Sequence, residues 1–103
     1  MGTDNSSAFE QWSPDGTCYT RVAADGPTLG IQLEPSIKAL SGSQIADRIM
    51  ACNDVAYLEG RLALRAVFEQ DPDRFSLDGL ETQEDLNAAR RRLHRFDPPE
   101  QRP

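Results

Sequence analysis

The chain has 103 residues, a formal net charge of −6 and 38% hydrophobic residues, which suits one ordinary globular domain. It contains no run of the ~20 apolar residues that a bilayer span requires. Residues 1–7 lack the basic and apolar segments of a secretory signal peptide. The excess of acidic residues disfavours electrostatic binding of nucleic acid by the protein surface as a whole. We therefore expect a cytoplasmic protein without a membrane span.

Three short strands separated by turn signals are predicted first. One covers Ala8 to Trp12 and stops at Ser13-Pro14-Asp15-Gly16, a pattern typical of a β-turn. The next covers Thr17 to Ala24 and ends at Asp25-Gly26, a strong hairpin signal. In the third, over residues 28–34, apolar and more polar residues alternate, which predicts a half-buried strand. Its apolar positions are Leu29, Ile31 and Leu33. The tight turns predict an antiparallel meander.

A long helix is predicted from a cap at Ser41 or Ser43 to about Gln70. At 1.5 Å per residue it is about 40 Å long and overhangs a sheet about 14 Å across. Its apolar residues form three stripes over more than half of its circumference, whereas a helix on one sheet needs only one stripe. The surplus apolar surface must be covered either by the C-terminal segment or by a second copy of the chain. The predicted dimer or partner interface is Met50, Val55, Tyr57, Leu58, Leu62, Leu64 and Phe68.

A shorter helix is predicted over residues 82–96, after a linker over residues 71–81 that opens with the helix-breaking Asp71-Pro72-Asp73. Thr82 caps this helix, and Asp85 is placed to complete a capping box. Its basic end has two interpretations, charge compensation of the helix dipole or contact with nucleic acid or an acidic partner. The arginines concerned are Arg90, Arg91, Arg92 and Arg95. Residues 1–7 and 97–103 are predicted to be disordered.

The residues that carry chemistry form no catalytic or metal-binding motif. A zinc site needs about four N or S ligands, and the spacing of Cys18, Cys52 and His94 fits no such pattern. Signatures of hydrolases, phosphate loops and metalloproteases are missing from the sequence. We expect no metal, no cofactor and no enzymatic activity. The two thiols are expected to be buried and inert in a reducing cytoplasm, with a disulfide between them as the alternative if strand and helix touch.

Four segments of the chain together resemble a known superfamily. They are Asp15–Gly26, Leu29–Pro35, Leu40–Ile49 and Asn53–Ala56. A turn glycine after a strand, a strand that exits at a proline, a Leu-Ser helix start and an Asn-Asp element occur in this order. The pattern is similar to the YbaB/EbfC superfamily in its actinobacterial branch. More narrowly, it resembles the Esp proteins (EspD, EspH and EspL types) encoded with mycobacterial type VII (ESX) secretion systems.

This resemblance, which spans about residues 8–70, implies a YbaB-like α+β protomer that forms a homodimer and has no enzymatic activity. The expected fold is a three-stranded antiparallel meander, a long helix and a shorter C-terminal helix. Together with the surplus apolar surface, it favours a cytosolic, chaperone-like accessory protein of type VII secretion that binds another protein. The alternative is a nucleoid-associated DNA-binding protein of the YbaB/EbfC type. That protein would use the arginine cluster, and the net charge disfavours it.

Overall fold

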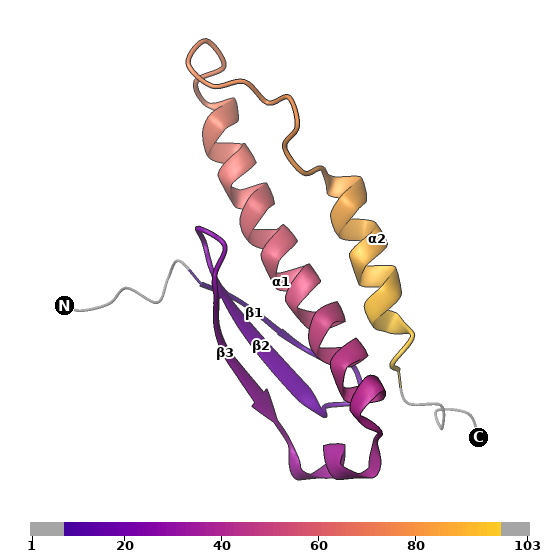
Figure 1. The fold of residues 1–103 in the computed structure, drawn as a ribbon. Coiled ribbons are helices and arrows are strands. Elements are labelled where there is room, and N and C mark those ends of the chain that lie inside the picture. Colours follow the sequence, from indigo (N-terminus) through magenta and orange to yellow (C-terminus); the bar gives the residue numbers. More distant parts are fainter. Residues whose placement is uncertain (1–7, 98–103) are drawn as a thin grey trace, which may run out of the picture.

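The computed structural model describes residues 8–97, which form a sheet, a long helix and a shorter helix (Figure 1). The elements are β1 (Ala8–Trp12), β2 (Cys18–Ala23), β3 (Thr28–Leu33), the 3-10 helix η2 (Pro35–Ala39), α1 (Gly42–Glu69) and α2 (Gln83–His94). The predicted α+β fold, a meander followed by a long and a shorter helix, is confirmed. The predicted disorder of residues 1–7 and 98–103 lies outside the described residues. Asp97, which the sequence assigns to the tail, is described and donates its backbone N–H to the His94 carbonyl.

The sheet has β2 at its centre, paired antiparallel with β1 and with β3. Alternate β2 residues face α1, and Cys18, Thr20 and Val22 are buried there. The β2–β3 turn places Gly26 at φ 117°, a backbone conformation that residues with a Cβ rarely adopt. The outer face of the sheet carries Trp12, whose ring lies beside that of Tyr19 with 5.2 Å between centroids. In the part of the chain that the structure describes, α1 packs on the inner face of the sheet and no helix covers the outer face (Figure 1).

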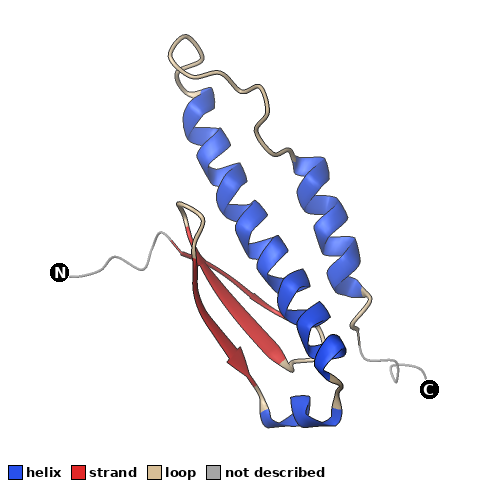
Figure 2. Cartoon of the chain, viewed as in Figure 1, coloured by secondary structure: helices blue, strands red, loops and turns tan. Residues whose placement is uncertain are grey.

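Helix α1 lies between the sheet and α2, as Figure 2 shows. Its predicted cap is confirmed at Ser41, whose hydroxyl accepts a hydrogen bond from Gln44 N while the Gln44 side chain accepts from Ser41 N. The predicted capping box of Thr82 and Asp85 starts α2. Buried residues from all three layers meet in one core. They are Cys18 of β2, Ile37 of η2, Ala51, Cys52 and Val55 of α1, and Leu86, Ala89 and Leu93 of α2.

Gly60 explains how closely β1 approaches α1. This residue is buried within the helix, where glycine costs about 1 kcal/mol relative to alanine. A Cβ at this position would lie 3.1 Å from Cδ2 of Phe9 on β1. The ring of Phe9 therefore occupies the space that any other residue would need, and this contact positions β1 beneath the helix.

The C-terminal part of α1 extends beyond the sheet (Figure 1). Its 28 residues span about 42 Å, whereas a strand of 6 residues spans about 20 Å. The linker returns beside this overhang, where the ring of Phe75 stacks on Phe68 with 4.3 Å between centroids. Arg61 Nε also donates to Glu81 Oε1 at 3.0 Å. The C-terminal segment thus covers part of the surplus apolar surface, which is one of the two alternatives left open by the sequence.

Candidate functional site

The structure separates the predicted interface residues of α1 instead of collecting them on one surface. Val55 is completely buried in the core of its own chain, so its assignment to an exposed interface is wrong. Leu58 and Leu62 are half-buried and pack against the same core. Residues of α2 form a large part of that core, so this flank of α1 is closed within the chain.

Of the other predicted interface residues, Met50 and Tyr57 line grooves between α1 and the C-terminal segment, and Phe68 lies on the overhang. Met50 is the most exposed of them, at 64%. Tyr57 is half-buried beside the β2–β3 turn, where a Cβ at Gly26 would lie 3.7 Å from its ring. Leu64 is half-buried, and Phe68 is half-buried in its stack with the linker ring. Of this group, Met50 is the residue that offers a largely free apolar side chain.

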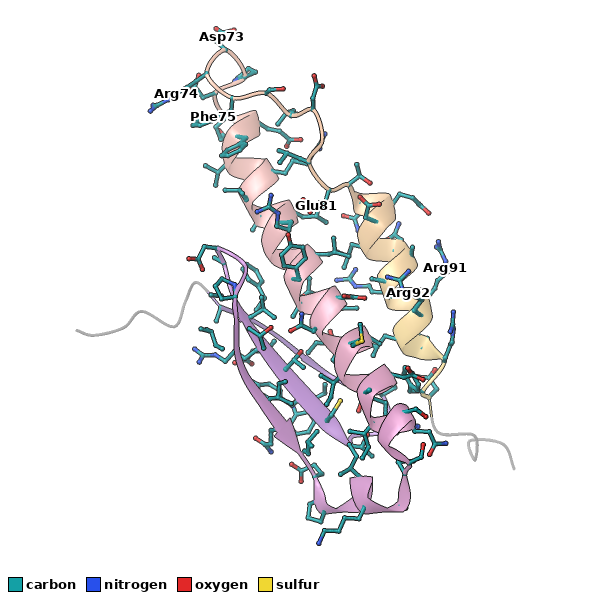
Figure 3. The ribbon with its side chains drawn as sticks, viewed as in Figure 1. Asp73, Arg74, Phe75, Glu81, Arg91 and Arg92 are labelled. Atoms are coloured by element: carbon teal, nitrogen blue, oxygen red, sulfur yellow. The ribbon has the colours of Figure 1, made fainter. Side chains whose placement is uncertain are left out.

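The arginines at the end of α2 lie close to carboxylates. Arg90 Nη2 is 2.9 Å from Glu59 Oε2, and Arg92 Nη2 is 3.7 Å from Asp54 Oδ2, both on α1. Arg91 Nη2 lies 3.2 Å from an acidic side chain in the first turn of α2 itself. Figure 3 shows Arg91 and Arg92 on this helix. The charge of these three arginines is therefore balanced by carboxylates of the fold, an arrangement that neither interpretation from the sequence contained.

The fourth arginine, Arg95, lines a shallow groove between α1 and the end of α2. Its volume is about 330 Å³. Its walls bring together predicted residues from both candidate groups and add two acids, an alanine and an aromatic ring: Asp47, Met50, Ala51, Asp54, Arg92, Arg95 and Phe96. The lining combines two acids of α1 with two arginines at the end of α2. The groove therefore offers neither a uniformly cationic surface for phosphate nor a continuous apolar one.

The apolar residues of β3 form an exposed surface that the sequence did not predict. Leu29, Ile31 and Leu33 are 54%, 50% and 45% exposed. In the sheet register, Ile31 lies opposite Thr20 and Leu33 lies opposite Cys18, and both of these β2 partners are completely buried. Paired residues of antiparallel strands point to the same face. The buried inner face of the sheet therefore continues onto β3 at Ile31 and Leu33, past the strands on which α1 packs, whereas Leu29 lies at an irregularity in the pairing with β2.

Backbone groups of β3 also point outward, along the edge of the sheet that faces away from β2. Glu34 N–H donates to the Thr17 carbonyl of the β1–β2 turn at 2.9 Å. Because backbone groups of a strand alternate in direction, the N–H and C=O of Ile31 and Leu33 point away from β2. Within the described part of the chain, β3 is an edge strand, and its sequence TLGIQL contains no charge and no proline. Proteins usually protect edge strands with charged residues or proline. Because β3 has neither, its edge is suited to pair with another strand.

A polar cluster in the β1–β2 turn attaches this end of the sheet to α1. Asp15 Oδ2 accepts from Arg48 Nε at 2.8 Å, and Oδ1 accepts from the hydroxyls of Ser13 and Thr17, both at 2.7 Å. Burial alone would raise the pKa of Asp15, but these hydrogen bonds outweigh it and lower the pKa to about 2. The guanidinium of Arg48 also lies 4.6 Å from the centre of the Phe96 ring. A carboxylate held so firmly in its ionised form joins elements rather than transferring protons.

Residues 8–97 contain no group of three or more His, Cys, Asp or Glu side chains placed to hold a metal ion. In the same residues, neither helix combines the length and the apolar character needed to cross a bilayer.

Comparison with known proteins returned no matching family model, curated protein or solved structure. The class of the protein is therefore defined by its fold: an α+β domain in which one helix lies between a three-stranded meander and a second helix. The resemblance to the YbaB/EbfC superfamily stays a prediction from the sequence.

Proposed function

We propose that the chain is a non-enzymatic interaction module that binds through the open edge of β3. The observation that carries this proposal is the apolar row of β3, in which Ile31 and Leu33 are half-exposed on one face of a neutral edge strand. Such a strand offers two kinds of contact at once. Its outward N–H and C=O groups bind a second strand, and its apolar side chains are buried when that strand brings its own.

The partner that we propose is a second copy of the chain. Two β3 strands related by a twofold axis pair antiparallel and join the two sheets into one. Both sets of apolar side chains then lie on the same face, in the space between the two α1 helices. The strand carries no charge, so no like charges meet across the twofold axis. This homodimer would bury the apolar side chains of β3, which α1 and α2 leave exposed.

The cellular role that we propose is that of a cytoplasmic, chaperone-like accessory protein of type VII secretion, and it rests on the sequence resemblance. DNA binding through the end of α2 is less well supported. Arg90, Arg91 and Arg92 each have a carboxylate within 4 Å. The net charge of −6 also opposes it. Binding to DNA would require these arginines to exchange their carboxylate partners for phosphates.

The mass in solution tests the dimer. Light scattering over a range of concentrations is expected to give the wild type twice the 11.4 kDa of one chain. Ile31→Lys places a charge in the apolar row and is expected to give a folded monomer. Gln32→Lys is the matched control, because it adds the same charge on the neighbouring residue, which faces the other side of the sheet, and it should stay dimeric.

Circular dichroism verifies that both variants are folded. A wild type that stays monomeric, or an Ile31→Lys variant that stays dimeric, would show that β3 is not the interface. A mobility shift with DNA at low salt that weakens steeply as salt rises would favour the alternative role.

A further inference from the structure

Two thiols meet in the core between β2 and α1. Cys18 is the first residue of β2, Cys52 lies in α1, and both are completely buried. Their sulfur atoms are 3.6 Å apart, and both cysteines are free in the structure. This separation is van der Waals contact between sulfurs, so no backbone element has to cross the core to bring them together. The contact that the sequence left open between this strand and helix is therefore present.

We propose that Cys18 and Cys52 form a reversible intramolecular disulfide that joins β2 to α1. The oxidant is a low-molecular-weight disulfide. One cysteine, as its thiolate, attacks a sulfur of the oxidant, which gives a mixed disulfide and releases the first thiol. The second cysteine then attacks the protein sulfur of the mixed disulfide and releases the second thiol. Two electrons and two protons pass from the cysteine pair to the oxidant, and one S–S bond replaces another.

The burial of the pair controls how fast this exchange proceeds. Burial raises the pKa of the Cys52 thiol, and the neighbouring Cys18 raises it further. The closed fold therefore contains little thiolate at Cys52, and an oxidant has no access to either buried sulfur atom. Exchange requires β2 and α1 to separate locally, so mild denaturant accelerates it. The pair stays reduced during brief exposure to an oxidant and becomes bridged during long exposure or when the core opens.

The disulfide would close a loop that contains β2, β3, η2 and the first part of α1. A bridge across a loop of this length restricts the unfolded chain and stabilises the folded state. Since β3 lies inside the loop, the bridge also restrains the strand that carries the open edge. The inference does not depend on the proposed function, because it requires only the contact between the two sulfurs.

Glutathione disulfide, applied to the full chain in dilute urea below the unfolding transition, tests the proposal. Mass spectrometry is expected to show the loss of two hydrogens per chain and of both alkylatable thiols. The melting temperature is expected to rise by about 10 °C, and dithiothreitol should reverse both changes. Cys18→Ala and Cys52→Ala are matched controls, because each keeps one thiol and gains no stability from the oxidant.

Several outcomes would overturn the proposal. They are retention of both thiols after prolonged oxidation in urea, stable attachment of glutathione to either cysteine of the wild type, a disulfide between two chains, or a bridge that lowers the melting temperature. Because the mass is measured on the wild type, the test stands even if one of the alanine variants fails to fold.

Discussion

The apolar surfaces on the two sides of the unit formed by the sheet and α1 are covered to different extents. On one side, α2 buries Leu86, Ala89 and Leu93 in the shared core, and ion pairs such as Arg90–Glu59 lie at its margin. On the other side, β3 leaves Ile31 and its apolar neighbours half-exposed, beside backbone groups that have no strand partner within residues 8–97. We call these the closed side and the open side. Both are apolar, so hydrophobicity alone does not explain the difference.

Chain connectivity explains it. The linker after α1 brings α2 back along one flank, and a tethered segment has a high effective concentration at the surface that it can reach. A second copy competes poorly for that flank. The linker runs on the α2 side of α1, away from β3 (Figure 1). Surplus apolar surface therefore predicts an external partner only where the chain's own segments do not reach.

The largest expected effect lies in the core of the closed side. Val55→Asp places a carboxylate where the side chain is completely buried. It should lower the free energy of unfolding by at least about 4 kcal/mol, most of the stability of a small domain. Met50→Asp, on the same helix at 64% exposure, should change it by about 0.5 kcal/mol or less. Urea denaturation followed by circular dichroism measures both, and similar losses in the two variants would show that burial in the structure does not separate core from surface on α1.

An intermediate effect is expected where the β1–β2 turn is attached to α1. The pKa of Asp15 is lowered from 3.8 to about 2, so its ionised form stabilises the fold at any pH above about 4. This contribution is lost as the pH falls through about 2, where the folded state also takes up the proton. Asp15→Asn should cost about 2 kcal/mol at pH 7, and its difference from the wild type should shrink between pH 4 and pH 2.

Asp25→Asn is the control for the turn, because Asp25 is exposed in the next turn of the sheet and its replacement should have little effect at any pH. Stability measured by urea denaturation at a series of pH values checks the prediction. A loss in Asp15→Asn that is as large at pH 2 as at pH 7 would show that shape, rather than charge, makes this residue necessary.

Local chemistry made most of the fold predictable. The Pro14-Asp15-Gly16 turn, the Asp25-Gly26 hairpin, and the caps at Ser41 and Thr82 each satisfy backbone groups through nearby residues, and each is where the sequence placed it. Helix η2 was not predicted, because its single turn leaves no periodicity to read. It begins at Pro35 and buries Ile37.

The candidate site was much less predictable. Periodicity shows that a face is apolar but not what covers it, so Val55 and Met50 looked equivalent although one is completely buried and the other 64% exposed. Likewise, Ile31 alternates as in any half-buried strand. Its exposure depends on which strands α1 crosses, a tertiary feature that no local pattern contains. One signal was available, because the last strand of a short meander is necessarily an edge.

The smallest expected effect concerns the charges at the margin of the closed side. Arg90 and Glu59 are partly exposed, at 47% and 27% of their side chains, so their pairing competes with water. Arg90→Gln should therefore lower the free energy of unfolding by less than about 1 kcal/mol, and less again in high salt. Leu86→Ala, in the core beneath, should cost about 2–4 kcal/mol at any salt concentration. Should Arg90→Gln cost more than Leu86→Ala, charge rather than apolar packing would hold α2 in place. The arginines would then be committed to the fold and would be poor candidates for contacts with phosphate.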